Sequence, residues 1–471
     1  MIGTVFTSGR NRGLRTALAL SLLLLGGMPA MAQTLVCNLD GAKVVEGEGR
    51  AFYSARSVPK GQSCDSVAQT RTCDAGDMSG SDSYRYHDCI TLEYFLGANV
   101  NRRPGLLMPE LLEVSETDWV RANVDILMYE AQDKAGSEDK RWQYGDWDVF
   151  KAAVEDDDRK AILNLMWDFG RYEIAPPAPG SKREAELFAY LDTRILDDLA
   201  PYADIIVSGN EPFVNTREQD WAFNKKRQEI PLVAFYERVT EHVNDYLVEN
   251  DMRDRIDLYM GAFTRLHTKK MQDQPALKAL LGYAENATFV DGIDLHTHVT
   301  TVKQLEKALK FARQYSTKPM LVTEFSFVWR TKKGLEDGTL GPEFAKAWGY
   351  DPNTKTTDYL ACNVFGMTKG CRKDWRVSQA EWNDFMASRE WWLDNFILDS
   401  YKLFQEYGVR GSTFVLTQDD DGPSRKQMST DRPPWYMGGL FYLGGVEPHP
   451  DGSPQTNYQY LDDYLAIQNS K

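Results

Sequence analysis

Eight short runs of apolar and β-branched residues recur between residues 93 and 418, and this repetition constrains the fold more than any other feature. Runs of this length and composition are typical of buried strands. They cover residues 93–101, 119–128, 160–169, 203–211, 256–263, 292–299, 319–327 and 411–418. The chain is therefore predicted to place eight strands in one sheet.

Segments with helical spacing separate most of these runs. Residues 184–200, 232–250 and 301–315 carry apolar side chains near every third and fourth position, which predicts amphipathic helices. Alternating strands and helices predict an α/β protein, and eight such repeats predict a closed (β/α)8 TIM barrel over residues 90–471. Its longest insertion is expected at residues 330–407, between the seventh and eighth strands.

The segment before the barrel, residues 33–89, is rich in Gly and Ser and is too short to bury a large core. An even number of cysteines favours disulfides in an exported chain. We expect two bridges among the first four cysteines, in one of three pairings, and one bridge between the last two. The six are Cys37, Cys64, Cys73, Cys89, Cys362 and Cys371. Residues 33–89 are thus predicted to form a small disulfide-linked, β-rich module.

The first 32 residues have the layout of a secretory signal peptide. Arginines up to Arg15 precede an apolar run at residues 17–25, and Ala30-Met31-Ala32 has the small-x-small pattern of a cleavage site. The run is shorter than the ~20 residues that cross a bilayer, so it does not predict a membrane anchor. We expect cleavage after Ala32 and a secreted or periplasmic protein.

The net charge of the chain indicates which kinds of binding partner are disfavoured. Lys and Arg total 54 against 69 for Asp and Glu, so the formal net charge is −15. This excess argues against nucleic acid and anionic membranes as partners, because both repel negative charge. The composition, 42% hydrophobic and 26% charged, is typical of a globular protein.

Two glutamates lie where predicted strands end. Reactive groups of a (β/α)8 barrel sit at the carboxyl ends of its strands. The fourth run ends in Asn210-Glu211-Pro212, and Glu324 follows a wholly apolar stretch in the seventh. Glycoside hydrolysis needs such a pair: one carboxylic acid protonates the departing oxygen, and the other carboxylate attacks or activates water. We expect the charge of one glutamate to raise the pKa of the other.

This pattern resembles the retaining (β/α)8 glycoside hydrolases of clan A, whose members include β-xylosidases, iduronidases and cellulases. The resemblance implies that Glu211 is the acid/base, that Glu324 is the nucleophile and that Asn210 binds the sugar 2-hydroxyl. It also implies that no cofactor is needed. Members often carry a His or Tyr on the sixth strand near the nucleophile, which implies a substrate-site role for His296 or His298.

Aromatic side chains are further candidates for a sugar site, because their faces pack on sugar rings. Many members of clan A have a Trp at the end of the eighth strand, where this chain has Thr417-Gln418. Trp435 in the following loop is a candidate replacement, and Trp167 at the end of the third strand is another candidate. Trp391 and Trp392 lie in a helical-looking run and are expected to pack in the core.

Three functions fit these residues. We favour an exported retaining glycosidase that acts on a poly- or oligosaccharide, because both glutamates occur on the appropriate strands. A non-catalytic polysaccharide-binding barrel is the alternative, which the missing Trp of the eighth strand permits. A metal-dependent hydrolase is the third, since His296 and His298 stand one residue apart on a strand, although no metal site is predicted.

Overall fold

The computed structural model describes most of the chain that follows the predicted signal segment. The described residues are 35–40, 42–55, 57–59, 62–87, 89–136, 147–155, 158–336, 338–364, 376–417, 437–442 and 445–470. The predicted signal peptide, Cys371, Gln418 and Trp435 lie outside these ranges, so the structure does not test the predictions made for them.

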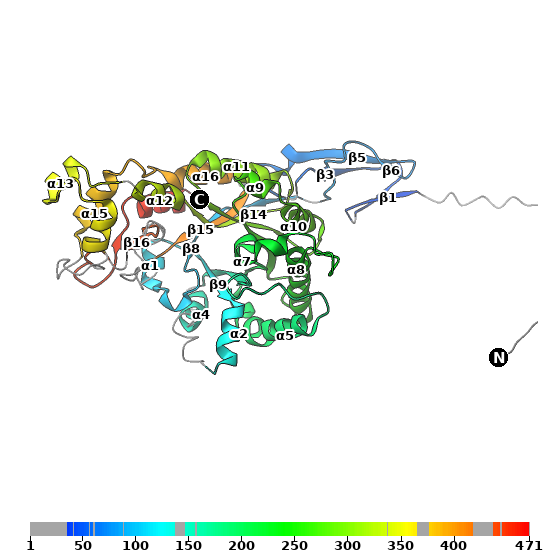
Figure 1. Ribbon diagram of the computed structural model, residues 1–471. Helices are drawn as coiled ribbons and strands as arrows, with labels where there is room; N and C mark the ends of the chain where they lie inside the picture. The colour runs from blue at the N-terminus through cyan, green and yellow to red at the C-terminus, as the bar shows by residue number, and fades with distance from the viewer. Residues whose placement is uncertain are drawn as a thin grey trace, which may run out of the picture.

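Eight parallel strands close into a barrel, as the eight runs predict (Figure 1). The strands are β8 (Phe95–Asn99), β9 (Trp119–Asp125), β10 (Lys160–Met166), β11 (Ile205–Val207), β12 (Asp257–Thr264), β13 (Gly292–His298), β14 (Met320–Ser326) and β15 (Val409–Val415). They neighbour one another in chain order, and β15 pairs with β8 to complete the ring. The (β/α)8 fold class is therefore confirmed, although β11 is shorter than its run and β15 begins two residues earlier.

The interior of the barrel is layered. A small apolar cluster fills one end of it, and that cluster consists of Phe95, Ile162, Ile205, Val207, Tyr259 and Leu321. Buried polar side chains fill the other end, where the strands terminate at their carboxyl ends, and they include Asn99, Arg121, Asn164, Asp294 and His296. The fold thus gathers these polar side chains at the carboxyl end of the strands.

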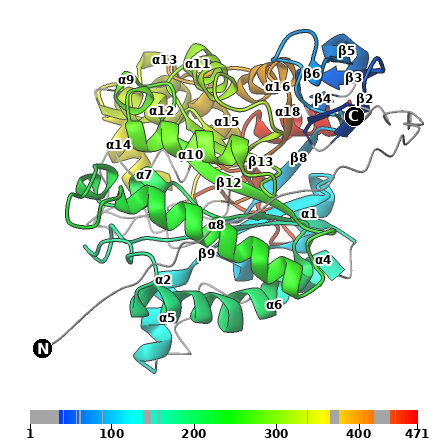
Figure 2. The same ribbon diagram turned by 90° about the vertical axis from the view of Figure 1, so that its right-hand side faces the viewer.

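Helices cover the outside of the barrel. The longer ones are α1 (Pro109–Val114), α2 (Ile126–Lys134), α4 (Trp147–Glu155), α5 (Lys182–Leu191), α8 (Pro231–Glu249), α10 (Pro275–Asn286), α11 (Val302–Arg313), α16 (Phe396–Glu406) and α18 (Tyr460–Gln468). Ser181 and Thr301 cap α5 and α11 by accepting backbone N–H groups. Figure 2 shows α8 and α10 side by side on the outer surface. The predicted helix at 184–200 is interrupted after α5 by a π-helical turn.

The insertion between β14 and β15 adds further helices before α16. They are α12 (Val328–Glu336), α13 (Pro342–Trp348), α14 (Thr356–Tyr359) and α15 (Gln379–Ala387). Cys362 lies in this insertion and is disulfide-bonded. Trp391 and Trp392 follow α15 in a non-helical stretch, so the single helix expected there is wrong. Among the described residues, no helix is both long and apolar enough to span a membrane.

The N-terminal module consists of short strands, as predicted. They are β1 (Val36–Leu39), β2 (Ala42–Val45), β3 (Gly49–Tyr53), β4 (Ser57–Pro59), β5 (Ala68–Asp74), β6 (Asp77–Met78) and β7 (Ile90–Leu92). Disulfides join Cys37 to Cys73 and Cys64 to Cys89, which selects one of the three pairings left open by the sequence. A core of five residues centred on Phe52 surrounds the first bridge.

The module lies at the end of the barrel opposite the strand carboxyl ends. Arg85 and Tyr86 of the module contact Glu285, and Tyr86 also contacts Thr317. Glu285 lies in the last turn of α10, and Thr317 lies in the loop that leads into β14, so the module touches segments next to the amino ends of β13 and β14. Figure 1 places β1, β3, β5 and β6 at one end of the molecule and α13 and α15 at the other.

Candidate active site

The loop after β11 presents Glu211 at the mouth of the barrel. Glu211 has a left-handed backbone conformation, with φ of 46° and ψ of 60°, and Pro212 begins the short helix α7 (Pro212–Asn215) directly after it. The backbone N–H of Glu211 donates to the carbonyl of Ala262 on β12 at 3.1 Å. This turn carries the side chain of Glu211 away from the strand direction and into a cavity that Asn210 also lines.

Glu324 on β14 is held by a buried arginine. Arg121 on β9 is wholly inaccessible to solvent, and its Nη1 donates to Oε1 of Glu324 at 2.5 Å. Three amide oxygens accept its other N–H groups: those of Asn164 at 3.1 Å, Asn99 at 3.0 Å and Asn210 at 2.8 Å. A fully bonded guanidinium of this kind fixes both the charge and the orientation of the carboxylate. The sequence analysis did not identify Arg121.

His296 on β13 lies between the two glutamates. Its Nδ1 is 3.3 Å from Oε1 of Glu211 and 3.6 Å from Oε2 of Glu324. These two carboxylate oxygens therefore lie at most about 7 Å apart, a range that includes the ~5–5.5 Å of retaining glycosidases. The structure thus brings together the two glutamates, Asn210 and His296 that the sequence singled out.

The charges of this cluster determine its pKa values. Burial alone would raise the pKa of Glu324, but His296, Arg121 and His298 hold it well below the ordinary value of 4.5. Burial would likewise raise the pKa of Glu211, yet His296 and His298 lower it and outweigh the opposing charge of Glu324. The raised glutamate pKa expected from the sequence is therefore wrong for the unliganded protein.

The proton of the cluster resides on His296. Burial would lower the pKa of its imidazole, but the charges of Glu324 and Glu211 raise it above the ordinary value of 6.5. At pH values below this raised pKa, the site therefore holds two carboxylates with an imidazolium between them. Such a triad titrates as one coupled unit.

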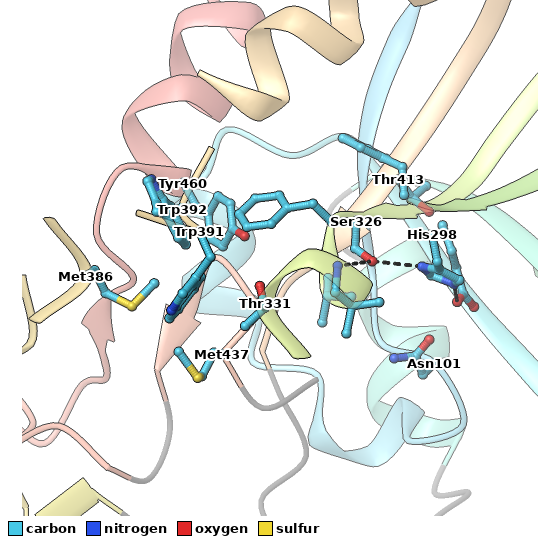
Figure 3. Close-up of a pocket in the computed structure, with 16 residues that line it drawn as sticks. Asn101, His298, Ser326, Thr331, Met386, Trp391, Trp392, Thr413, Met437 and Tyr460 are labelled. Carbon is cyan, nitrogen blue, oxygen red and sulfur yellow. Dashed lines mark hydrogen bonds and ion pairs between the residues drawn. The ribbon is translucent and has the colours of Figure 1, made fainter. Parts of the chain in front are cut away.

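His298 also lies beside Glu324, at the edge of a cavity. Its Nε2 is 3.3 Å from Oε2 of Glu324, and its Nδ1 is hydrogen-bonded to Oγ of Ser326 at 2.8 Å. Figure 3 shows His298 and Ser326 on one side of this cavity and Trp391, Trp392 and Tyr460 on the other. We call it the aromatic cavity, after those three residues.

A second, more open cleft adjoins the aromatic cavity, and Asn101 and Glu324 line both. Its other lining residues include Asp168, Asn210, Glu211 and three arginines, Arg102, Arg103 and Arg171. We call it the arginine cleft. Glu324 therefore stands at the junction of an aromatic space and a charged one.

The aromatic candidates of the sequence analysis are not the residues found in this site. Trp167 is wholly buried, packs edge-on against Phe235 and donates its indole N–H to the carbonyl of Ser208. It is a core residue, so its prediction as a substrate contact is wrong. Trp391, which was expected in the core, is instead partly exposed in the aromatic cavity. No local sequence pattern predicted this position for Trp391, because it depends on how the insertion packs against the barrel mouth in the tertiary structure.

The same cluster offers donors to a metal. One ligand atom each from Glu211, His296 and His298 lie within 4.8 Å of one another. However, Nη2 of Arg121 lies 3.3 Å from Nε2 of His296, and a permanent guanidinium charge opposes a divalent cation at this spacing. The donor set is better suited to sharing a proton than to holding a metal ion.

Comparisons with known proteins find similarity only among solved structures. No protein-family model and no curated protein matches the chain. A mutant of xylanase A from P fluorescens subsp. cellulosa in complex with xylopentaose is 16% identical, with 79% of this chain and 98% of that chain covered and a TM-score of 0.42. A β-glucosidase from Exiguobacterium marinum is 9% identical, with 80% and 99% covered and a TM-score of 0.42.

An endo-β1,6-glucanase is 10% identical, with 79% of this chain and 74% of that chain covered and a TM-score of 0.44. Similarity at this level carries no conclusion about activity. The residues of the site must supply that conclusion.

Proposed function

We propose that the protein is an exported retaining glycoside hydrolase that acts on a poly- or oligosaccharide. The observation that carries the proposal is the pair Glu211 and Glu324, which come from β11 and β14 and share His296 at one cavity. Paired carboxylates across a barrel mouth are what displacement at an anomeric carbon requires. The disulfides of the N-terminal module support export, because such bridges persist in oxidising compartments.

Glu324 is the nucleophile in this proposal. Its low pKa keeps it ionised. Arg121 holds Oε1, and Oε2, which lies 3.3 Å from Nε2 of His298, attacks the anomeric carbon. As the bond from Glu324 to that carbon forms, the glycosidic bond breaks and the departing oxygen takes a proton from Glu211. Water then attacks the glycosyl-enzyme, Glu211 removes its proton, and Glu324 leaves.

His296 accounts for how Glu211 can act as an acid although its resting pKa is low. The imidazolium holds the proton 3.3 Å from Oε1 of Glu211. When a sugar displaces water from the cavity, the desolvated carboxylate takes that proton and is ready to donate it. After transfer, the neutral imidazole remains between the two glutamates.

Two further groups are proposed to hold the sugar. Asn210 directs its amide oxygen to Arg121, which orients the amide for a hydrogen bond to the 2-hydroxyl of the sugar. Trp391 offers a partly exposed ring in the aromatic cavity, where a sugar face can pack.

Trapping with a panel of activated 2-fluoro sugars tests the proposal. We expect mass spectrometry to find the label on Glu324. Glu324→Gln should abolish turnover, whereas Glu211→Ala should regain activity with azide on a substrate that has a good leaving group. A label on another residue, or near-full activity of either variant, contradicts the assignment.

Two control experiments separate the alternatives. Binding of polysaccharides without release of reducing ends would identify a non-catalytic barrel. One ligand atom each from Glu211, His296 and His298 lie within 4.8 Å of one another, which makes a metal-dependent hydrolase the second candidate. That candidate predicts bound zinc and inactivation by chelator. Our proposal predicts that activity survives EDTA.

A further inference from the structure

Three arginines line the cleft beside the catalytic pair, in a chain whose net charge is −15. Arg102 and Arg103 follow β8, and Arg171 follows β10, so all three stand at the carboxyl ends of barrel strands. The same cleft contains Glu211 and Glu324. The protein as a whole is acidic, so a nearby negative group is expected to hold these arginines together at the mouth of the barrel.

The carboxylate of Asp125 holds two of these arginines in place. Asp125 ends β9, is almost completely buried, and its Oδ1 accepts the N–H of Met128 at the start of α2. Its Oδ2 lies 3.4 Å from Nη1 of Arg102 and 3.7 Å from Nη1 of Arg171. One buried carboxylate therefore anchors two guanidinium groups from different loops.

The two arginines present most of their donors to the cleft. Their side chains are 47% and 51% exposed, and each approaches Asp125 through one nitrogen only. Each guanidinium has five N–H donors in a planar fork that matches a carboxylate or sulfate. Asp168 also lines the cleft and accepts the backbone N–H of Arg171 at 3.0 Å. Arg102, Arg103 and Arg171 together carry one more charge than Asp125 and Asp168, while Glu211 and Glu324 lie against Arg121 and His296. That excess of positive charge can bind another anion.

We propose that Arg102 and Arg171 bind an anionic group of the substrate, so that the enzyme acts on acidic saccharides that carry uronate or sulfate. This inference rests on the proposed function and names the substrate class of the same site. The anionic sugar occupies the arginine cleft, and the neighbouring sugar, whose bond is cleaved, lies between Glu211 and Glu324. Asp125 positions both arginines and does not touch the substrate.

Matched pairs of oligosaccharides test the inference. Oligogalacturonides, alginate oligosaccharides and hyaluronan oligosaccharides are each compared with their carboxyl-reduced forms, and sulfated dextran oligosaccharides are compared with dextran. Titration calorimetry with Glu324→Gln measures binding without turnover. We expect at least one anionic form to bind ten-fold or more tightly than its neutral partner. Whether the carboxylated or the sulfated oligosaccharides show this preference then identifies the anion.

A double variant, Arg102→Gln with Arg171→Gln, should remove that preference in the same background, so that the anionic form binds no more than two-fold more tightly than its neutral partner. Arg194→Gln is the matched control, because Arg194 pairs with Asp133 on the outer surface and should change neither affinity. If the double variant folds poorly, the affinities of Glu324→Gln are measured at increasing NaCl concentration instead. Added NaCl should weaken binding of the anionic form and not of the neutral form.

Equal binding of every anionic form and its neutral partner overturns the inference, and so does a preference that the double variant keeps. These outcomes are distinct from failure of the proposed function. If fluoro sugars do not label Glu324 while acidic oligosaccharides still bind through the arginines, the glycosidase mechanism fails alone. If labelling succeeds and the charge preference is absent, only the substrate class fails.

Discussion

Arg121 makes it possible for two carboxylates to share one buried cavity. Two neighbouring carboxylates repel each other, and in a desolvated site one would take up a proton unless a positive charge lay close. Arg121 supplies a charge that cannot titrate, and its amide partners on three other barrel segments keep it in place. His296 supplies the second charge, which does titrate.

Replacing Arg121 by Gln is expected to raise the pKa of Glu324 and to lower kcat/KM by about 100-fold or more, the usual cost of losing one electrostatic contact at a reacting group. The folded-state pKa of Glu324 is depressed, so its stabilising contacts are present above pH 4.5 and are lost as the pH falls through that lower value. The acid limb of the pH–rate profile should therefore move to higher pH in the variant.

Arg410→Gln is the matched control for this experiment. Arg410 pairs with Asp257 at the amino end of the barrel strands, so its loss should lower the melting temperature and leave the acid limb in place. An unchanged acid limb in Arg121→Gln would contradict the role given to Arg121.

The second residue-scale prediction concerns His296. Its pKa is raised, so its ionic contacts are complete below pH 6.5 and are lost as the pH rises through the raised value. We expect kcat/KM to fall over the same window, because the shared proton is then gone. In His296→Asn, Glu211 must hold the proton alone, and the alkaline limb should move to lower pH.

His242→Asn provides the comparison, since His242 pairs with Asp192 on the outer surface. It should leave both limbs of the profile unchanged. A His296→Asn variant with the wild-type alkaline limb would exclude the proton-holding role.

At the scale of elements, the short strand β11 and its loop decide where Glu211 lies. The loop packs directly on β12: the N–H of Ala262 donates to the carbonyl of Gly209, and the N–H of Glu211 donates to the carbonyl of Ala262. A Cβ on Gly209 would lie 2.3 Å from the carbonyl oxygen of Gly261 and 2.6 Å from the ring of Tyr236. Only glycine permits this close approach.

Gly209→Ala should therefore displace Asn210 and Glu211 and lower kcat much more than it changes KM. It should also lower the melting temperature, because two backbone segments are forced apart. Gly282→Ala is the control: its Cβ meets nothing within 4 Å in helix α10, and it should stabilise the protein by up to about 1 kcal/mol. A fully active Gly209→Ala enzyme would show that the loop tolerates a shift.

At the scale of the whole molecule, the N-terminal module and the cluster of Glu211, His296 and Glu324 lie at opposite ends of the barrel. The module depends on two disulfides that close loops of 36 and 25 residues, whereas the barrel has its own large core. A disulfide of this size stabilises by about 2–4 kcal/mol. The two parts should therefore respond differently to reduction.

Under mild reducing conditions, or in Cys37→Ser with Cys73→Ser, we expect limited proteolysis to cut within residues 35–92 first. Labelling of Glu324 by a fluoro sugar should continue at 25 °C, because the strands that carry the site remain closed. Loss of labelling in step with cleavage of the module would show that the module supports the mouth of the barrel.

The sequence by itself determined the eight strands, the main helices and the two glutamates. Apolar runs and helical spacing can be recognised from neighbouring residues alone. Because the functional groups of a (β/α)8 barrel lie at the carboxyl ends of its strands, the predicted strand ends then indicate where to look for them. The prediction that Trp167 contacts substrate was wrong because a position at the end of a strand does not determine whether the ring faces the barrel mouth or the surrounding helices.

Only the tertiary structure decided the environment of the glutamates. Arg121 lies mid-strand in β9, and its partners come from β8, β10, β14 and the loop after β11. Asp125 draws Arg102 and Arg171 together from two loops, and the insertion returns Trp391 to the mouth. Charge, burial and proton location depend on distances between segments far apart in the chain, and closure of the barrel alone sets those distances.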